Sequence, residues 1–121
     1  MLFRSKILMM HGTSDTIVPF STSVRYVTRL RQAMGEAAVD SFLRFYGVAG
    51  MGHGFGRYLV GWKSLDMLEA WVERGQAPVN PTSVNVASLV GQSRPLCSYP
   101  SYPRYFGGDV NKASSFRCVS P

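Results

Sequence analysis

The chain has 121 residues, and its hydrophobic content of 45% suits one globular domain. Thirteen lysine and arginine residues against seven acidic residues give a formal net charge of +6, but the basic residues are scattered and form no nucleic-acid-binding motif. The apolar runs are far shorter than the ~20 residues that cross a bilayer, and the first residues lack the pattern of a signal peptide. We therefore expect neither a nucleic-acid partner nor a membrane partner.

The first predicted unit is strand, helix, strand. Residues 6–10 form an apolar run that is typical of a strand buried on both faces of a parallel sheet. After a turn-rich segment, one of residues 21–23 is expected to cap a helix, and Gly35 is expected to end it in the left-handed conformation. The apolar positions of this helix recur at helical spacing: Val24, Val27, Leu30 and Met34. Residues 41–48 form the second predicted strand, and the order predicts a right-handed parallel crossover.

A glycine-rich loop and a second helix come next. The loop spans residues 47–61, and its glycines allow sharp turns and close backbone approach. The helix after it ends before Gly75 and Pro78. Its apolar face, which we expect to pack on the sheet, contains Leu65, Leu68, Trp71 and Val72.

The composition changes after Pro78. Six of the seven prolines lie from Pro78 onward, as do both cysteines, Cys97 and Cys118. Because no helical or alternating period is present, residues 79–121 are predicted to be an extended tail of the same domain as residues 1–78. Two cysteines that close a loop of about 20 residues favour a disulfide, worth ~3 kcal/mol, over a zinc site, since the tail contains no histidine. A disulfide would indicate an oxidising compartment.

Two candidate catalytic residues follow the two predicted strands. Asp15 closes the sequence His-Gly-Thr-Ser-Asp at residues 11–15, and His53 lies within Gly-Met-Gly-His-Gly at residues 50–54. Catalytic groups of open α/β sheets gather at the carboxyl ends of the strands. A carboxylate there can orient a histidine, whose near-neutral pKa suits proton transfer. Taken singly, Asp15 could form only a side-chain turn and His53 could only brace its loop. The joint order of acid and then base is that of an α/β-hydrolase triad.

The remaining member of such a triad, a serine on a Gly-x-Ser-x-Gly turn, has no match in the chain. Ser14 has no base arranged beside it, and Ser93 and Ser98 lack a strand-turn-helix setting. His11 is expected to brace the loop that carries Asp15. We therefore expect the nucleophile to lie upstream of residue 1, in a longer protein.

Four stretches of the sequence resemble the tannase and feruloyl esterase family of α/β-hydrolases. They are residues 11–19, 48–53, 68–78 and 94–100. The most specific are Leu-Glu-Ala-Trp-Val-Glu-Arg-Gly-Gln-Ala-Pro at 68–78 and Arg-Pro-Leu-Cys-Ser-Tyr-Pro at 94–100, and the likeness runs from about residue 6 to residue 118.

The resemblance implies a secreted or periplasmic serine esterase that acts on small phenolic esters of the feruloyl or galloyl type. Asp15 would orient His53, His53 would activate the serine, and Cys97 would pair with Cys118. The family also has a large lid domain, often with a structural calcium ion, before this region. No cofactor and no metal ligand is therefore expected within this chain.

Together these inferences predict the C-terminal part of an α/β-hydrolase fold, with the last two parallel strands, their flanking helices and an extended, disulfide-closed tail. The parent would be a carboxylic-ester hydrolase, and the 121-residue chain alone is expected to be inactive. No oligomeric state is predicted.

One position departs from the family. Gly54 stands where the family usually has a cysteine linked to a cysteine beside the nucleophile, which indicates either a subgroup without this link or a loss of activity. The alternative function is a non-catalytic remnant or protein-interaction module, which would expose a strand edge and apolar helix faces and would tend to associate.

Overall fold

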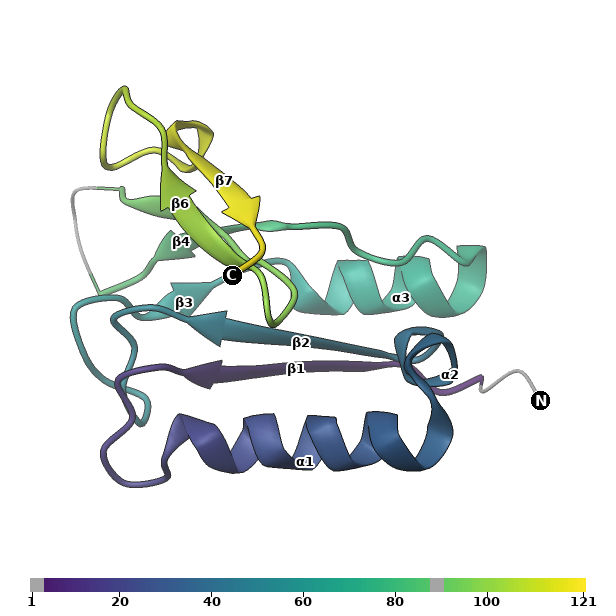
Figure 1. The fold of residues 1–121 in the computed structure, drawn as a ribbon. Coiled ribbons are helices and arrows are strands. Elements are labelled where there is room, and N and C mark those ends of the chain that lie inside the picture. The colour runs from purple at the N-terminus through teal and green to yellow at the C-terminus, as the bar shows by residue number, and fades with distance from the viewer. Residues whose placement is uncertain (1–3, 88–90) are drawn as a thin grey trace.

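The computed structural model describes residues 4–87 and 91–121. These residues form two parallel strands with flanking helices, followed by short antiparallel strands (Figure 1). The elements in chain order are β1 (Ile7–Gly12), α1 (Phe20–Met34), α2 (Glu36–Asp40), β2 (Leu43–Val48), β3 (Val60–Gly61), α3 (Ser64–Arg74), β4 (Thr82–Asn85), β5 (Ser93–Pro95), β6 (Tyr102–Tyr105), the 3₁₀ helix η1 (Ala113–Ser115) and β7 (Phe116–Val119).

The predicted strand-helix-strand unit is present. β1 and β2 pair in parallel, with Ile7 opposite Leu43 and Gly12 opposite Val48. α1 and α2 connect them, and because the strands are parallel, both end at the same edge of the sheet. β1 extends two residues further than predicted, to Gly12.

Alternation along β2 directs its side chains to helices on both faces of the sheet, α1 and α2 on one face and α3 on the other. Phe45 packs in a cluster with Val27 of α1 and with Val39 of α2. On the opposite face, the Arg44 guanidinium lies 4.8 Å from the centre of the Trp71 ring of α3. β2 is therefore covered on both faces, and four of its six residues are buried.

The start and the end predicted for the first helix are both wrong. α1 begins at Phe20 and has no side-chain cap, because its N-cap residue is Pro19, whose ring carries no hydrogen-bond acceptor. Gly35 has a positive φ of 86°, but its ψ of 148° is outside the left-handed helical region, and the chain turns there directly into α2.

On α3, Leu65 and Val72 are 73% and 51% exposed, whereas Trp71 is buried. A sheet of two strands covers only part of the predicted apolar face of this helix. Among the described residues, no helix is long and apolar enough to span a membrane.

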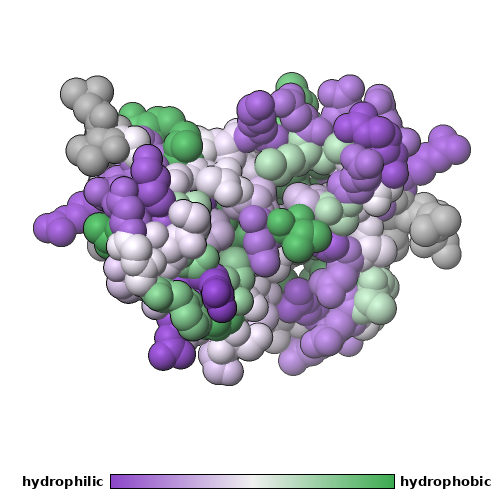
Figure 2. Space-filling model, turned by 90° about the horizontal axis from the view of Figure 1, so that it is seen from above, coloured by the Kyte–Doolittle hydropathy of each residue, from purple (hydrophilic) through white to green (hydrophobic). Residues whose placement is uncertain are grey.

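Residues 79–121 contain more structure than the predicted tail. β4 pairs antiparallel with β3 and β5, and β6 pairs with β7. The predicted disulfide between Cys97 and Cys118 is present, and it ties the segment after β5 to β7. In the view from above, which looks down from the side of β6 and β7, hydrophobic side chains form small, separate patches among hydrophilic ones (Figure 2).

Candidate active site

Asp15 lies three residues after the end of β1. Its Oδ1 accepts hydrogen bonds from the backbone N–H groups of Ile17, at 2.9 Å, and Val18, at 2.8 Å. This is the side-chain turn that aspartate often forms after a strand. Because both bonds use Oδ1, the other oxygen, Oδ2, remains available to a different partner.

That partner is His53, 38 residues further along the chain. Its Nδ1 lies 2.9 Å from Asp15 Oδ2. The Asp15 side chain is only 5% exposed, whereas the His53 side chain is 49% exposed. The structure thus brings the two predicted site residues together, with the acid buried and the imidazole accessible from outside.

The loops that carry these residues are in direct backbone contact. The N–H of Thr13 donates to Val48 O at 3.0 Å, and the N–H of Ser14 donates to Met51 O at 3.1 Å. A Cβ atom on Gly12 would overlap the carbonyl group of Met51. Gly12 is therefore a site residue that the sequence analysis missed, and the only sequence signal for it is a glycine two residues after an apolar run.

The His53 loop depends on glycine for its shape. Gly50 and Gly54 have φ of 80° and 77°, and the N–H of Gly52 donates to Phe55 O at 2.6 Å. No atom lies within 4 Å of a Cβ built on Gly54. A cysteine at position 54 would thus have room, but it would occupy a strained backbone conformation.

His11 forms a second imidazole contact to the same carboxylate. Its Nε2 lies 3.2 Å from Asp15 Oδ2 and 3.0 Å from Val18 O. Because both neighbours are acceptors, Nε2 carries the hydrogen. In the neutral imidazole Nδ1 then accepts from the Ser23 hydroxyl at 2.6 Å. His11 therefore braces the Asp15 loop, as predicted, and Ser23 is a supporting residue that the sequence analysis missed.

These contacts set the ionisation of Asp15. Burial alone raises the pKa of its carboxyl group. The hydrogen bonds from His53, Val18 and Ile17 outweigh burial and hold the pKa well below its usual range. Asp15 is consequently a stable anion at neutral pH, able to orient His53 and to stabilise its protonated form.

A hollow of about 410 Å³ lies beside the pair, and its lining includes Met10, Val18 and Met51 together with the two histidines and Asp15. No serine or cysteine is among its lining residues. The described residues also contain no group of three or more His, Cys, Asp or Glu side chains that could hold a metal ion. The arrangement can orient an imidazole and transfer a proton.

Comparison with known proteins gives consistent similarities. Residues 3–119 match the family described as tannase and feruloyl esterase. The chain is 41% identical to an uncharacterized esterase of Agrobacterium fabrum over 94% of its own length and 21% of that protein. It is 37% identical to the mono(2-hydroxyethyl) terephthalate hydrolase of Piscinibacter sakaiensis over 96% of its own length and 20% of that protein.

Among solved structures, the feruloyl esterase B of Aspergillus oryzae superimposes with a TM-score of 0.79 and 28% identity. This alignment covers 94% of the chain and 27% of the solved structure. The fold is therefore that of the tannase and feruloyl esterase structures, and the chain spans only about a fifth to a quarter of the relatives it matches.

Proposed function

Because this chain belongs to the tannase and feruloyl esterase family, we propose that it supplies the acid and the base of a Ser-His-Asp triad in a carboxylic-ester hydrolase. The observation that carries the proposal is the 2.9 Å contact between His53 Nδ1 and Asp15 Oδ2, made between loops that follow two parallel strands. A buried acid that orients an imidazole through its Nδ1–H is the arrangement that such a triad requires.

In the proposed mechanism Asp15 keeps the Nδ1–H of His53 in place. His53 Nε2 then removes the proton from a serine hydroxyl, and the serine oxygen attacks the ester carbonyl carbon. His53 returns the proton to the leaving alkoxide, which departs as the alcohol and leaves an acyl-enzyme. Water, activated by the same imidazole, hydrolyses that acyl-enzyme.

The serine and the oxyanion-hole donors are proposed to lie in a longer parent, of which this chain is the C-terminal part. In support, the relatives are about four to five times longer than the matched segment. Among the described residues β1 pairs with β2 alone, and Ile7 and Met10 on β1 are partly exposed. The parent sheet would continue along this free edge.

We propose phenolic esters of the feruloyl or galloyl type, or related aromatic monoesters, as substrates of the parent, and a secreted or periplasmic location. The family description and the terephthalate ester hydrolase support the substrate class, and the disulfide supports the compartment. No cofactor or metal is assigned to this chain. A calcium site like that of the family would lie in a lid domain outside it.

The test begins with the nucleotide sequence upstream of the Met1 codon, read in frame. If the frame continues into a Gly-x-Ser-x-Gly turn, the longer protein is assayed with methyl ferulate and methyl gallate.

Asp15→Asn should lower kcat by about 10⁴-fold and His53→Gln by about 10⁶-fold. Arg29→Gln, on the exposed face of α1, serves as the control and should leave kcat unchanged. Full activity of either site variant would contradict the proposal, and the 121-residue chain alone should show no triad-dependent hydrolysis.

One observation favours the alternative of a non-catalytic interaction module. Leu65 and Val72 of α3 are exposed apolar side chains, in addition to Ile7 and Met10 of β1. A surface of this kind promotes association. If the upstream frame is closed and the 121-residue chain forms a defined oligomer in size-exclusion chromatography with light scattering, this alternative replaces the catalytic one.

A further inference from the structure

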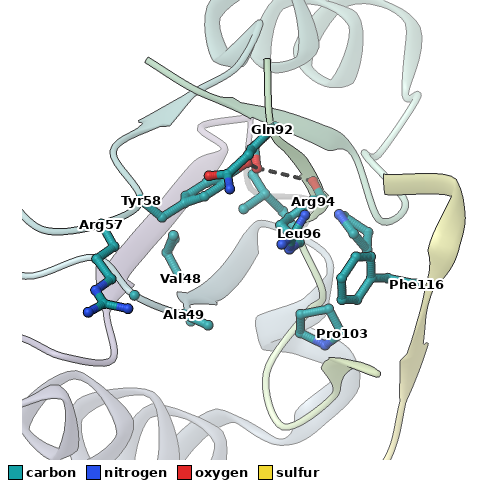
Figure 3. A pocket seen from close by; sticks show the side chains of 13 residues that line it. Val48, Ala49, Arg57, Tyr58, Gln92, Arg94, Leu96, Pro103 and Phe116 are labelled. Atoms are coloured by element: carbon teal, nitrogen blue, oxygen red, sulfur yellow. Dashed lines mark hydrogen bonds between the residues drawn. The ribbon is translucent and has the colours of Figure 1, made fainter. Parts of the chain in front are cut away.

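We propose that a second cavity, lined in part by the segment that follows β2, binds a small aromatic carboxylate. The cavity has a volume of about 360 Å³ and lies between the end of β2, the β3–β4–β5 sheet and the β6–β7 hairpin (Figure 3). It shares no lining residue with the hollow beside Asp15 and His53. The inference is thus independent of the proposed function.

The walls favour a flat apolar ligand. Val48 and Leu96 are buried and line the cavity, and Pro103 and Phe116 form the wall on the side of the hairpin (Figure 3). The aromatic ring of Tyr58 adds a further flat surface. A volume of about 360 Å³ is at the low end of the range for small-molecule sites, which limits the ligand to about one ring with a short substituent.

The charge of the lining favours an anion. Arg57 and Arg94 both line the cavity, no lining residue is acidic, and neither guanidinium is in an ion pair within the described residues. In Figure 3 the two arginines lie on either side of Val48. Guanidinium groups in this setting match the oxygens of a carboxylate.

Arg94 is held ready for such a contact. One terminal nitrogen donates to Ser93 O at 2.7 Å, and the guanidinium carbon lies 4.2 Å from the centre of the Phe116 ring. Since a guanidinium has five N–H donors, several remain for a ligand. A guanidinium that is already stacked loses little freedom when the ligand binds.

The other polar groups of the lining already have partners. The Tyr58 hydroxyl lies 2.9 Å from Ser83 Oγ, and Ser83 donates to Arg94 O at 3.1 Å. Gln92 accepts from Asn85 and donates to Asn111. The spare side-chain donors of the lining are those of the arginines and the second N–H of the Gln92 amide. The polar end of the ligand should therefore accept hydrogen bonds, as an ionised carboxylate does.

The disulfide connects the two apolar walls. Cys97 directly follows Leu96. Cys118 lies two residues after Phe116 and opposite Pro103 in the register of β6 and β7. It therefore fixes the distance between the wall after β5 and the wall on the hairpin. A cavity that is held open before the ligand arrives binds it at lower entropic cost.

The test is calorimetric titration of the oxidised 121-residue chain with benzoate. A ligand of this size with these contacts should bind with a Kd in about the millimolar range. Acetate and sulfate, which lack the ring, and benzyl alcohol, which lacks the charge, should each bind at least about tenfold more weakly. The proposal is overturned if benzoate does not bind. Binding of acetate, sulfate or benzyl alcohol as tight as that of benzoate would overturn it as well.

Variants then locate the site. Arg94→Gln should weaken benzoate binding about tenfold, because it removes a charge-assisted contact. Arg57→Gln, on the other side of Val48, should weaken it several-fold, because it removes a positive charge from the lining. Arg29→Gln on α1 is the matched control and should bind as the wild type does. Arg57 has an exposed side chain, so its variant should fold even if the Arg94 variant does not. Unchanged affinity in the folded arginine variants would overturn the proposal.

Two further measurements separate this site from the proposed catalytic pair. Asp15→Asn should leave benzoate affinity unchanged, whatever the activity of the parent. The double variant Cys97→Ala, Cys118→Ala should lower the affinity several-fold, because the walls of the cavity are then no longer tied together. Weaker binding in Asp15→Asn, with the disulfide variant unaffected, would place the benzoate site at the catalytic pair instead and overturn the proposal.

Discussion

Residues 4–78 fold around buried apolar side chains, and one of their buried polar groups is the Asp15 carboxylate of the candidate site. The described residues that are polar and buried as a whole, Ser83, Asn85 and Ser115, all lie after residue 78. The first region is held mainly by non-directional contacts between its three helices and the strand pair. The second region uses directional hydrogen bonds and one covalent link. The contrast indicates that damage to the first region should affect the whole chain, and damage to the second should remain local.

The largest expected effect is in the first region. Phe45 is buried, stacks on Phe20 at 5.6 Å and packs at a tilt against Tyr99 at 5.6 Å, measured between ring centres. Phe45→Ala should lower the free energy of unfolding by about 3–5 kcal/mol, because it removes a ring and leaves a cavity. Urea unfolding followed by circular dichroism measures the change. Phe55→Ala, at an exposed ring, is the control. A decrease of less than about 1 kcal/mol in the free energy of unfolding would show that this core contributes little to the stability of the fold.

Removal of the disulfide should have the next largest effect. Cys97→Ala with Cys118→Ala should cost about 3 kcal/mol by chain-entropy arithmetic for a separation of 21 residues. Amide hydrogen exchange should show protection lost in β5, β6 and β7 and retained in β1 and β2. Equal loss of protection in both regions would remove the distinction between them.

A smaller effect is expected at Asn85. Its Oδ1 accepts from the N–H groups of Leu59 and Ala87, and its Nδ2 donates to Arg57 O and to Gln92. Asn85→Ala should destabilise the chain by about 1–3 kcal/mol, since it leaves buried backbone groups without partners. Asn111→Ala removes one side-chain hydrogen bond and is the matched control. Thermal unfolding of both variants should place Asn111→Ala closer to the wild type.

The smallest expected effect is the loss of stability of the folded chain at acid pH. The pKa of Asp15 is lower in the folded chain than the ~3.9 of an unfolded aspartate, so its ionised form contributes stability above about pH 4. That contribution is lost as the pH falls below about 4 toward the folded pKa. Between pH 5 and pH 3 the wild type should therefore lose more free energy of unfolding than Asp15→Asn, as urea unfolding at the two pH values would show. Equal losses in the two proteins would contradict this.

The sequence alone was sufficient to predict most of the helices and strands of residues 4–78 and the position of the candidate site. A continuous apolar run, helical spacing and two strand-terminal motifs predicted β1, α1, β2 and α3, and placed Asp15 and His53 at the same edge of the sheet. These signals are local, because the spacing of apolar residues that marks a helix or a strand repeats within a short stretch of sequence. The disulfide was predicted as well, because two cysteines in one tail leave only one pairing.

The tertiary structure decided what depends on residues distant in the sequence. The strands of residues 79–121 have only three or four residues each, too few to show a period, and the partner of β4 in the sheet, β3, lies more than 20 residues earlier. Gly12 is required by the carbonyl of Met51, and Ser23 by His11, two contacts that no local pattern records. Which apolar residues of α3 are buried depends on how wide a sheet they meet, so Leu65 and Val72 were misassigned. Local spacing determines an element, and only the packing of elements against one another determines which of its faces is covered.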